Sequence, residues 1–318
     1  MGSRVRDFHT SANGTITYLS LPPHRVRGGH DRSPQSMPGT LFVVSTPIGN
    51  LEDITARALR VLQEVAIVAA EDTRRTAGLF ARHAISTPTT SLHEHNERGK
   101  ADTLVARLQG GEDVALVSDA GTPTMSDPGA VVIRKAIDAG IRVVPVPGPN
   151  AALAALAASG LPSDTFTFLG FPPTRSRERT AWLERLKSAA GTVVFFEAPH
   201  RIRETLAQIR LVVGDVPVVL GRELTKVHEE FLRGPISGVL SRLTRPIGEF
   251  TVVIDVRQAA GAGVGELAAD ATLLGEFGEL TAASGMNRRQ AVNVLARRHR
   301  RAPNDIYAAI ERAKHTER

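Results

Sequence analysis

Acidic and histidine residues gather in four short clusters, each of which follows an apolar run typical of a β-strand. Carboxylates and imidazoles held at such positions can accept and donate protons during catalysis. Each cluster also has a structural interpretation, in which a carboxylate caps the next helix or forms a surface ion pair. The residues alone therefore leave the identity of a general base open. The clusters are Glu71 with Asp72, His93 to Glu97, Glu197 with His200, and Glu223 with Lys226 and Glu229.

A metal site is a further interpretation of His93 and His95, because alternate residues of a strand face the same side. The pair has no third ligand at a suitable spacing, and we predict no metal. The chain contains no Cys, which excludes disulfide bonds and Cys-ligated zinc or iron–sulfur sites. This composition fits a reducing compartment.

Three loops rich in Gly and Pro follow predicted parallel strands, at residues 46–50, 119–129 and 147–150. Ligands of open α/β sheets bind outside this edge, where glycine lets the backbone approach a ligand and proline stiffens the loop. A single such loop is more simply a turn, but three at one edge predict a binding site. The sequence has neither a G-x-x-x-x-G-K-[ST] loop nor a G-x-G-x-x-G turn after its first strand, which argues against ordinary nucleotide triphosphatases and dinucleotide oxidoreductases.

Short β-branched runs alternate with helical stretches from residue 41 onward, a pattern typical of a parallel sheet covered by helices. The five strands of this first domain are predicted at 41–45, 65–70, 89–92, 114–118 and 141–146. A second, mixed domain has predicted strands at 166–170, 192–197, 216–222, 228–233 and 249–256, the last ones antiparallel. We divide the chain into a disordered basic leader (1–36), an N-terminal α/β domain (37–160), a second α/β domain (161–258) and a linker with about three helices (259–318).

Charge is distributed unevenly along the 318 residues, whose formal net charge is +6. Residues 286–318 hold nine Arg or Lys against three Asp or Glu, and the first 40 residues hold five against two. Basic ends on a mildly acidic body suggest a polyanionic partner, although a solvated tail and leader would have the same composition. The apolar runs are too short to cross a membrane, so we predict a soluble protein without a membrane partner.

Eight strings of the sequence, taken together and in order, resemble a family of small-subunit ribosomal RNA methyltransferases within the tetrapyrrole (corrin/porphyrin) methylase superfamily. The similarity covers residues 41 to about 256, and the leader before Met37 departs from the family pattern. The strings are VVSTPIGNLEDIT (43–55), AAEDTRRT (69–76), LHEHNE (92–97), LVSDAGTPTMSDPG (116–129), VPVPGPNA (144–151), LGFPP (169–173), FFEAPHRI (195–202) and GRELTKVHEEFLRG (221–234).

This resemblance implies an α/β fold with two αβα domains of the tetrapyrrole methylase type, a cleft between them and a small C-terminal helical domain. It implies transfer of a methyl group from S-adenosylmethionine to the 2′-hydroxyl of a cytidine ribose in 16S ribosomal RNA. The implied partners are small ribosomal subunit RNA, within the assembled subunit, and a second copy of the chain in a homodimer. The implied location is the cytoplasm.

The resemblance also assigns roles to individual residues. The implied donor-binding residues are Pro47, Gly49, Leu51, Ser118, Asp119, Ala120, Gly121, Thr122, Ser126, Asp127, Pro147, Gly148, Ala151, Phe196, Glu197, Leu224 and Thr225. As catalytic residues we favour Asp72, Arg74 and Glu223, which end strands at the cleft edge within the similar strings. RNA contacts are predicted at Arg74, Arg75, Arg175, Arg177, Arg201, Arg288, Arg289, Arg297 and Arg298.

Two other functions stay open at this point. A precorrin or uroporphyrinogen C-methyltransferase would share the donor cleft but would not need a basic helical tail. A non-catalytic RNA-binding assembly factor would keep the α/β shell without the reaction. The helices after residue 280 resemble a helix-turn-helix unit, and a dimer-packing bundle with a basic face is the alternative.

Overall fold

The computed structural model describes residues 37–189, 191–257, 270, 272–282, 286–299 and 303–316. The predicted leader and most of the predicted linker lie outside these residues. No helix among the described residues is long and apolar enough to cross a membrane.

The first sheet is parallel, with strand order β3-β2-β4-β1-β5. Its central strands β2 and β4 are buried along their whole length, which explains why they appear in the sequence as continuous apolar runs. The strands are β1 (Thr40–Val44), β2 (Ile67–Ala70), β3 (Thr89–Ser91), β4 (Val114–Val117) and β5 (Arg142–Val146).

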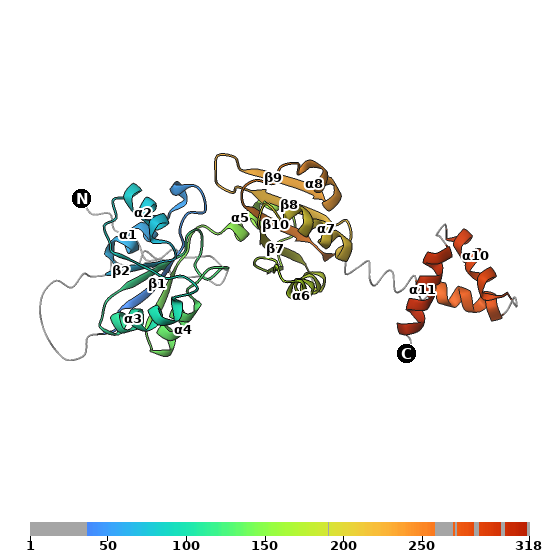
Figure 1. The fold of residues 1–318 in the computed structure, drawn as a ribbon, viewed down its shortest axis with the longest axis horizontal. Helices are drawn as coiled ribbons and strands as arrows, with labels where there is room; N and C mark the ends of the chain where they lie inside the picture. Colours follow the sequence, from blue (N-terminus) through green and yellow to red (C-terminus); the bar gives the residue numbers. More distant parts are fainter. Residues whose placement is uncertain are drawn as a thin grey trace, which may run out of the picture. The chain divides into compact units, whose positions relative to one another are not determined.

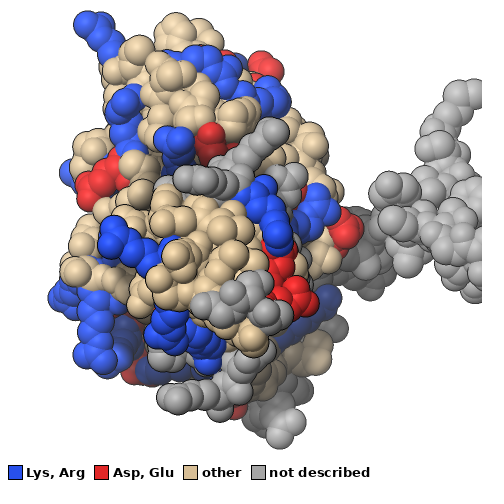
Figure 2. All heavy atoms as spheres, turned by 90° about the vertical axis from the view of Figure 1, so that its right-hand side faces the viewer, with Lys and Arg blue, Asp and Glu red and all other residues tan. Residues whose placement is uncertain are grey.

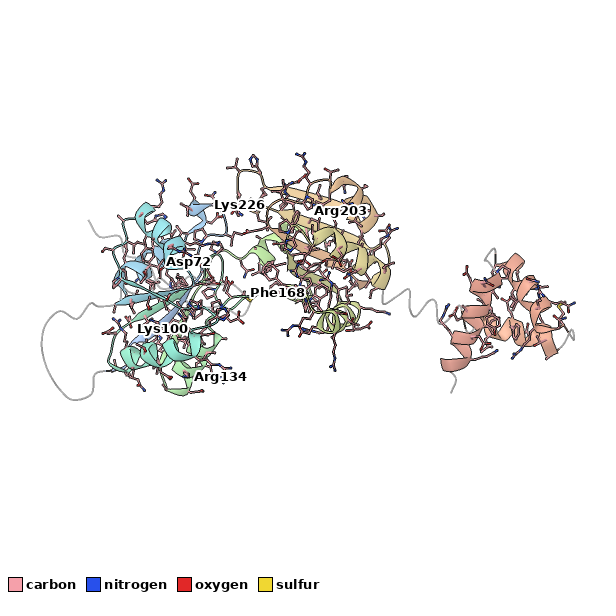
Figure 3. The ribbon with its side chains drawn as sticks, viewed as in Figure 1. Asp72, Lys100, Arg134, Phe168, Arg203 and Lys226 are labelled. Atoms are coloured by element: carbon pink, nitrogen blue, oxygen red, sulfur yellow. The ribbon has the colours of Figure 1, made fainter. Side chains whose placement is uncertain are left out.

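Helices cover both faces of this sheet. The helices α1 (Ala56–Glu64) and α2 (Thr73–Arg82) pack on one face, and α3 (Glu97–Gln109) and α4 (Ala130–Asp138) pack on the other (Figure 1). Arg134 on α4 is exposed, whereas Lys100 on α3 donates to the Thr90 hydroxyl of β3 at 3.1 Å (Figure 3). The side chains of Thr55 and Asp72 cap α1 and α2, so the helices begin at the carboxyl edge of the sheet.

The second sheet is mixed, with strand order β6-β7-β10-β8-β9. The strands β6 and β7 are parallel, whereas β10 is antiparallel to β7 and β8, and β8 is antiparallel to β9. A core around Trp182 and the fully buried Phe195 joins one face to its helices. The elements are β6 (Phe166–Phe168), α6 (Ser176–Lys187), β7 (Thr192–Glu197), α7 (Ile202–Val213), β8 (Pro217–Arg222), β9 (Glu230–Pro235), α8 (Ile236–Arg242) and β10 (Phe250–Asp255).

The other face of the second sheet is covered by α5 (Ala151–Ser159), whose residues Ala155 and Leu156 pack against Val194, Val219 and Val253. This helix precedes the domain boundary that we predicted at residue 160, yet its core contacts are with the second sheet. Because α5 begins at the carboxyl edge of the first sheet, it links that edge directly to the second sheet.

Strand β9 begins at Glu230, two residues later than predicted. A tight turn occupies the preceding segment, in which Glu223 and Thr225 have φ angles of 49° and 65°. The Thr225 N–H donates to the Glu229 carboxylate at 2.7 Å, which holds the turn closed. Local backbone geometry therefore delays the strand.

The described C-terminal residues form a small helical unit with its own core. Residues 272–282 are helical and are followed by α10 (Arg288–Arg298) and α11 (Pro303–Thr316). The side chains of Phe277, Leu295 and Ile306 meet in this core. The predicted α/β fold class is confirmed, with two helix-covered sheets followed by C-terminal helices.

Candidate active site

A cavity of about 440 Å³ opens at the carboxyl edge of the first sheet and is closed by loops of the second sheet. It brings together many of the predicted donor-binding residues, from two loops of the first sheet and two segments of the second. Those that line it are Asp119, Ala120, Gly121, Thr122, Ser126, Asp127, Ala151, Phe196, Glu197 and Leu224.

A second cavity, of about 290 Å³, adjoins the first and shares Arg75 and Asp119 with it. Three further predicted donor-binding residues, Pro47, Leu51 and Ser118, line this second cavity. The structure thus divides the predicted donor residues between two neighbouring spaces.

Four predicted donor-binding residues line neither cavity, namely Gly49, Pro147, Gly148 and Thr225. A Cβ atom on Gly49 would lie 2.8 Å from Thr225 Oγ1, and one on Gly148 would lie 3.0 Å from Ser45 Cβ. The Thr225 hydroxyl also accepts the Asn50 N–H at 3.0 Å. These residues hold the loops against one another, so close packing accounts for the two glycines.

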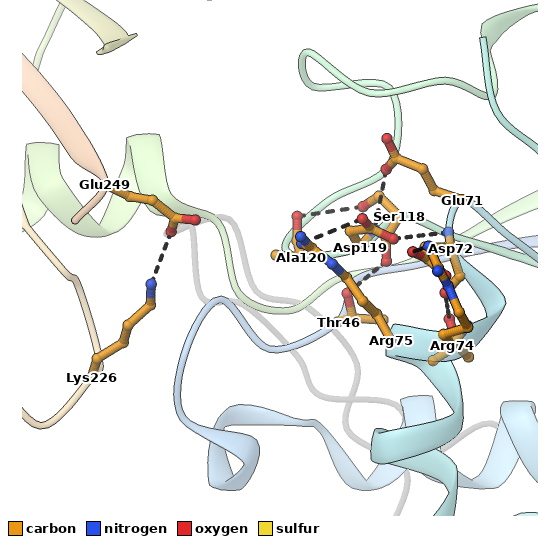
Figure 4. A network of polar contacts seen from close by, with 11 residues as sticks. Thr46, Glu71, Asp72, Arg74, Arg75, Ser118, Asp119, Ala120, Lys226 and Glu249 are labelled. Atoms are coloured by element: carbon orange, nitrogen blue, oxygen red, sulfur yellow. Dashed lines mark hydrogen bonds and ion pairs between the residues drawn. The ribbon is translucent and has the colours of Figure 1, made fainter. Parts of the chain in front are cut away.

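Five carboxylates line the first cavity, and three of them, those of Glu71, Asp119 and Asp127, come from loops of the first sheet. The Asp119 N–H donates to Glu71 Oε2 at 3.2 Å, and Asp119 Oδ1 accepts the Asp72 N–H at 2.9 Å (Figure 4). Arg75 reaches from α2 to within 3.4 Å of Asp119 Oδ2. These contacts tie the ends of β2 and β4 together and concentrate negative charge at the cavity wall.

Burial and mutual repulsion shift the pKa values of Glu71 and Asp127. Burial is the largest effect on Glu71 and raises its pKa. Burial, together with the charge of Glu71, raises the pKa of Asp127 to about 6, while a hydrogen bond from Ser118 acts in the opposite direction. A site that disfavours its own ionised carboxyl groups is stabilised by a bound cation.

Aromatic side chains form another part of the wall. The rings of Phe171 and Phe196 both line the first cavity, with their centroids 5.4 Å apart. Phe168 packs edge-on against Phe196 and supports it from the second sheet. Sequence analysis missed Phe171 as a site residue, although it lies within the similar string at residues 169–173.

Other lining residues were also not predicted. They come from the loops after β1 and β4, the segment before α5, the end of β7 and the start of β10. No motif indicated that β10 would reach the cavity, because its approach depends on the sheet order. These residues are Ile48, Met125, Asn150, Ala198, Pro199, Glu249, Phe250 and Thr251.

Glu197 lies at the cavity wall but is held by protein contacts. It is 1% exposed and pairs with Arg201 at 2.7 Å. The Ala198 N–H donates to the same oxygen, Oε1, at 2.7 Å, and the other oxygen, Oε2, accepts the Thr205 hydroxyl at 2.6 Å. Arg201 also donates to the Pro172 carbonyl at 3.3 Å, so the pair fixes the loop that carries Phe171. Arg201, predicted to contact RNA, therefore takes part in an internal ion pair.

The favoured catalytic residues, Asp72, Arg74 and Glu223, line neither cavity. Asp72 caps α2 and pairs with Arg74 at 2.8 Å, and these hydrogen bonds lower the Asp72 pKa to about 2. Glu223 accepts the Glu249 N–H and pairs with Lys226 at 3.0 Å, contacts that lower its pKa as well. Carboxylates with lowered pKa values are weak bases near neutral pH.

Most of the predicted RNA-binding arginines are exposed. The side chains of Arg74 and Arg75 are 89% and 68% exposed at the start of α2. Arg298 pairs with Glu276 at 2.9 Å, and the side chain of Arg297 lies outside what the structure describes. Lys and Arg cover more of the face drawn in Figure 2 than Asp and Glu do. The exposed residues also include Arg175, Arg177, Arg288 and Arg289.

His93 and His95 do not form part of a metal cluster. Their rings meet edge-on at 6.0 Å, and His93 Nε2 lies 3.0 Å from the Asn96 side-chain amide. Among the described residues, no group of three or more His, Cys, Asp or Glu is arranged to hold a metal ion.

The first cavity thus lies where loops of the two sheets meet, and its wall is acidic and aromatic. The sequence profile of the Tetrapyrrole (Corrin/Porphyrin) Methylases matches residues 40–240, and the chain belongs to this family.

Within that family, several curated relatives carry the name Ribosomal RNA small subunit methyltransferase I. The one from Pseudomonas aeruginosa is 52% identical over 226 residues, which cover 70% of this chain and 80% of the relative. The one from Escherichia coli O157:H7 is 46% identical over 233 residues, covering 72% and 82%. The one from Bacillus subtilis is 47% identical over 219 residues, covering 68% and 75%.

Solved structures share the fold at lower identity. A diphthine synthase superposes with a TM-score of 0.55 at 15% identity, covering 68% of this chain and 89% of that one. The native form of uroporphyrin III C-methyl transferase from Thermus thermophilus superposes with a TM-score of 0.50 at 17% identity, covering 69% and 99%.

Proposed function

We propose that the chain is an S-adenosylmethionine-dependent methyltransferase that methylates the 2′-hydroxyl of a cytidine ribose in small-subunit (16S) ribosomal RNA. The names of its curated relatives support an enzyme that methylates small-subunit ribosomal RNA. The observation that carries the proposal in this chain is the cluster of carboxylates in the first cavity. The same relatives do not favour a tetrapyrrole substrate or a non-catalytic role.

The donor fits the chemistry of the first cavity. S-adenosylmethionine supplies a methyl group on a sulfonium cation and carries no phosphate. The carboxylates of Asp119 and Asp127 match the positive charges of such a ligand, and the rings of Phe171 and Phe196 offer apolar surface to its adenine. The hydroxyl of Thr122, which also lines the cavity, is a partner for the amino acid end.

Proton removal is the second requirement, since a ribose hydroxyl is a poor nucleophile until it loses its proton. A carboxylate with a raised pKa is a better base near neutral pH than one with a lowered pKa. By this criterion Glu71 and Asp127 are stronger candidates than Asp72 and Glu223. Arg74 is a candidate for binding the RNA backbone, since its guanidinium is exposed beside the cavity edge.

The proposed partners follow from the proposed substrate. Exposed arginines at the start of α2, in the segment 175–177 and on α10 are suited to contact phosphates of RNA within the assembled subunit. The resemblance to the methylase superfamily supports a homodimer. A ribosomal substrate supports a cytoplasmic location.

The test is transfer of a tritiated methyl group to small ribosomal subunits from cells that lack the enzyme, followed by nuclease mapping of the product. The expected product is 2′-O-methylcytidine at one position. Asp102→Asn should transfer the label as the wild type does, because Asp102 is an exposed carboxylate on α3 that pairs with Lys135 away from both cavities. Label found in a base would exclude the proposed reaction. Absence of 2′-O-methylcytidine, when the protein transfers label to the subunit, would also exclude it.

A further inference from the structure

We propose that the second cavity, lined by Pro47, Leu51, Thr76, Gly78 and Leu79 among others, receives the target nucleotide of the RNA after it leaves the stack of its strand. This inference rests on the proposed function and assigns the two neighbouring cavities to the two substrates. Enzymes that modify a nucleotide take it out of the stack and bind it in a pocket of its own.

The two cavities lie next to each other. Methyl transfer requires the acceptor oxygen to lie next to the donor, and correct positioning supplies much of the rate. The two cavities share Arg75 and Asp119. The backbone of Thr46 pairs with that of Gly121 at 2.9 and 3.0 Å, and these residues line the second and the first cavity, respectively. The Arg75–Asp119 ion pair and the Thr46–Gly121 backbone bridge therefore lie at the boundary between the two cavities.

The second argument is charge. Glu71 and Asp127 line the first cavity, whereas Asp119 is the only acidic residue among the described residues that line the second. Asp119 already pairs with Arg75 at 3.4 Å. Arg75 and its neighbour Arg74 place two exposed guanidinium groups at the start of α2, beside the second cavity. A cationic donor thus favours the first cavity, and an anionic nucleotide favours the second.

The third argument is the composition of the wall. Pro47, Leu51 and Leu79 provide apolar surface, and Leu51 is 42% exposed at the mouth. Hydroxyl groups of Thr76 and Ser118 lie among them. Flat bases of single-stranded RNA bind to apolar surface by their faces and to polar groups by their edges.

Gly78 offers a way to fill the second cavity without disturbing the fold. It lies on α2, is exposed, and no other side chain or distant backbone atom lies within 4 Å of the position that a Cβ atom would take. Gly99 on α3 has the same properties but lines neither cavity. Replacement of either glycine by Leu raises helix propensity, so Gly78→Leu and Gly99→Leu form a matched pair.

The experiment compares both variants with the wild type in methyl transfer to small subunits, in donor binding by titration calorimetry and in urea unfolding. We expect Gly78→Leu to lower kcat/KM for the subunit on the order of 100-fold, because a misplaced acceptor loses the effect of positioning. The donor Kd should stay within about twofold of the wild-type value. The unfolding midpoint should equal or exceed that of the wild type. Gly99→Leu should behave as wild type in all three assays.

Each other result has one meaning. Unchanged methyl transfer by Gly78→Leu would overturn the inference and leave the proposed function intact. Donor binding that weakens in parallel with transfer would assign the second cavity to the donor and also overturn it. Absence of methyl transfer by wild type and Gly99→Leu, with donor binding intact, would refute the proposed function itself.

Discussion

Replacement of Asp127 by Asn should stabilise the ligand-free protein near neutral pH while it weakens donor binding. Burial beside Glu71 raises the pKa of Asp127 to about 6, so the folded protein disfavours the ionised form that predominates at pH 8. Asn has nearly the shape of Asp but carries no charge. The substitution therefore removes an electrostatic cost from the free site and an electrostatic attraction from the complex.

The size of the effect follows from the displaced pKa. For a fully buried group the displacement would correspond to about 3 kcal/mol. Asp127 is only partly buried, and screening by solvent reduces the expected gain to about 1 kcal/mol. The cost is absent below the unfolded pKa of about 4, grows as the pH rises toward 6, and is complete above it. Wild type and Asp127→Asn should thus have equal stability at pH 4 and differ by about 1 kcal/mol at pH 8.

Urea unfolding without donor at pH 4, 6 and 8 measures the stability difference, and calorimetry measures donor affinity at pH 6 and 8. We expect the wild-type donor affinity to rise between these pH values and that of Asp127→Asn to be about tenfold weaker at pH 8, a change of about 1.4 kcal/mol. Asp102→Asn serves as the control and should match wild type. A variant that is less stable than wild type at pH 8 would show that the ionised carboxylate is satisfied in the free protein, contrary to our reasoning.

Three further predictions concern the residues that hold the site in place. Glu197→Ala removes the ion-pair partner of Arg201, whose side chain is 20% exposed, and we expect a loss of about 3 kcal/mol in urea unfolding; a loss below about 1 kcal/mol would mean that the ion pair is not a structural element. Gly248→Ala places a Cβ 2.5 Å from Glu223 Cγ at a φ of 88°, whereas Gly140→Ala has a φ of 70° and no atom within 4 Å of its Cβ. The melting temperature of Gly248→Ala should therefore fall well below that of Gly140→Ala, and equal melting temperatures would contradict this. Phe195→Ala should cost about 3–5 kcal/mol in the same assay, and a much smaller loss would indicate that the second core relaxes around the cavity.

The elements of the first sheet were accessible from the sequence because local signals agree with one another there. The β-branched runs of β2 and β4 are buried on both faces, and Asp72 and Asn150 cap the helices that follow the loops. Parallel strands joined by helices bring their carboxyl ends to one edge, so three Gly and Pro loops in the sequence already indicate where a ligand binds. The expected family and fold are confirmed on this basis.

The roles of neighbouring carboxylates could not be separated in the same way. Glu71 and Asp72 are adjacent in the sequence, yet only Glu71 lines a cavity, while Asp72 caps α2 and pairs with Arg74. Likewise, Glu197 was predicted to bind the donor and Arg201 to contact RNA, and the structure joins them to each other.

Patterns along the chain predict the type and order of the elements and the edge of the first sheet at which the cavities open. Contacts in the folded chain determine which carboxyl groups face the cavities, which of them pair with arginine, and how β10 and α5 complete the wall. Secondary structure follows from neighbours along the chain, whereas burial and charge depend on contacts between distant parts of it. Asp119, for example, is hydrogen-bonded to Asp72 and Glu71, which lie 47 and 48 positions earlier in the sequence. Burial and repulsion from carboxylates distant in the sequence raise the pKa of Glu71 and Asp127, whereas the neighbouring Arg74 lowers that of Asp72, so the acid–base chemistry of the cavity depends on the folded chain.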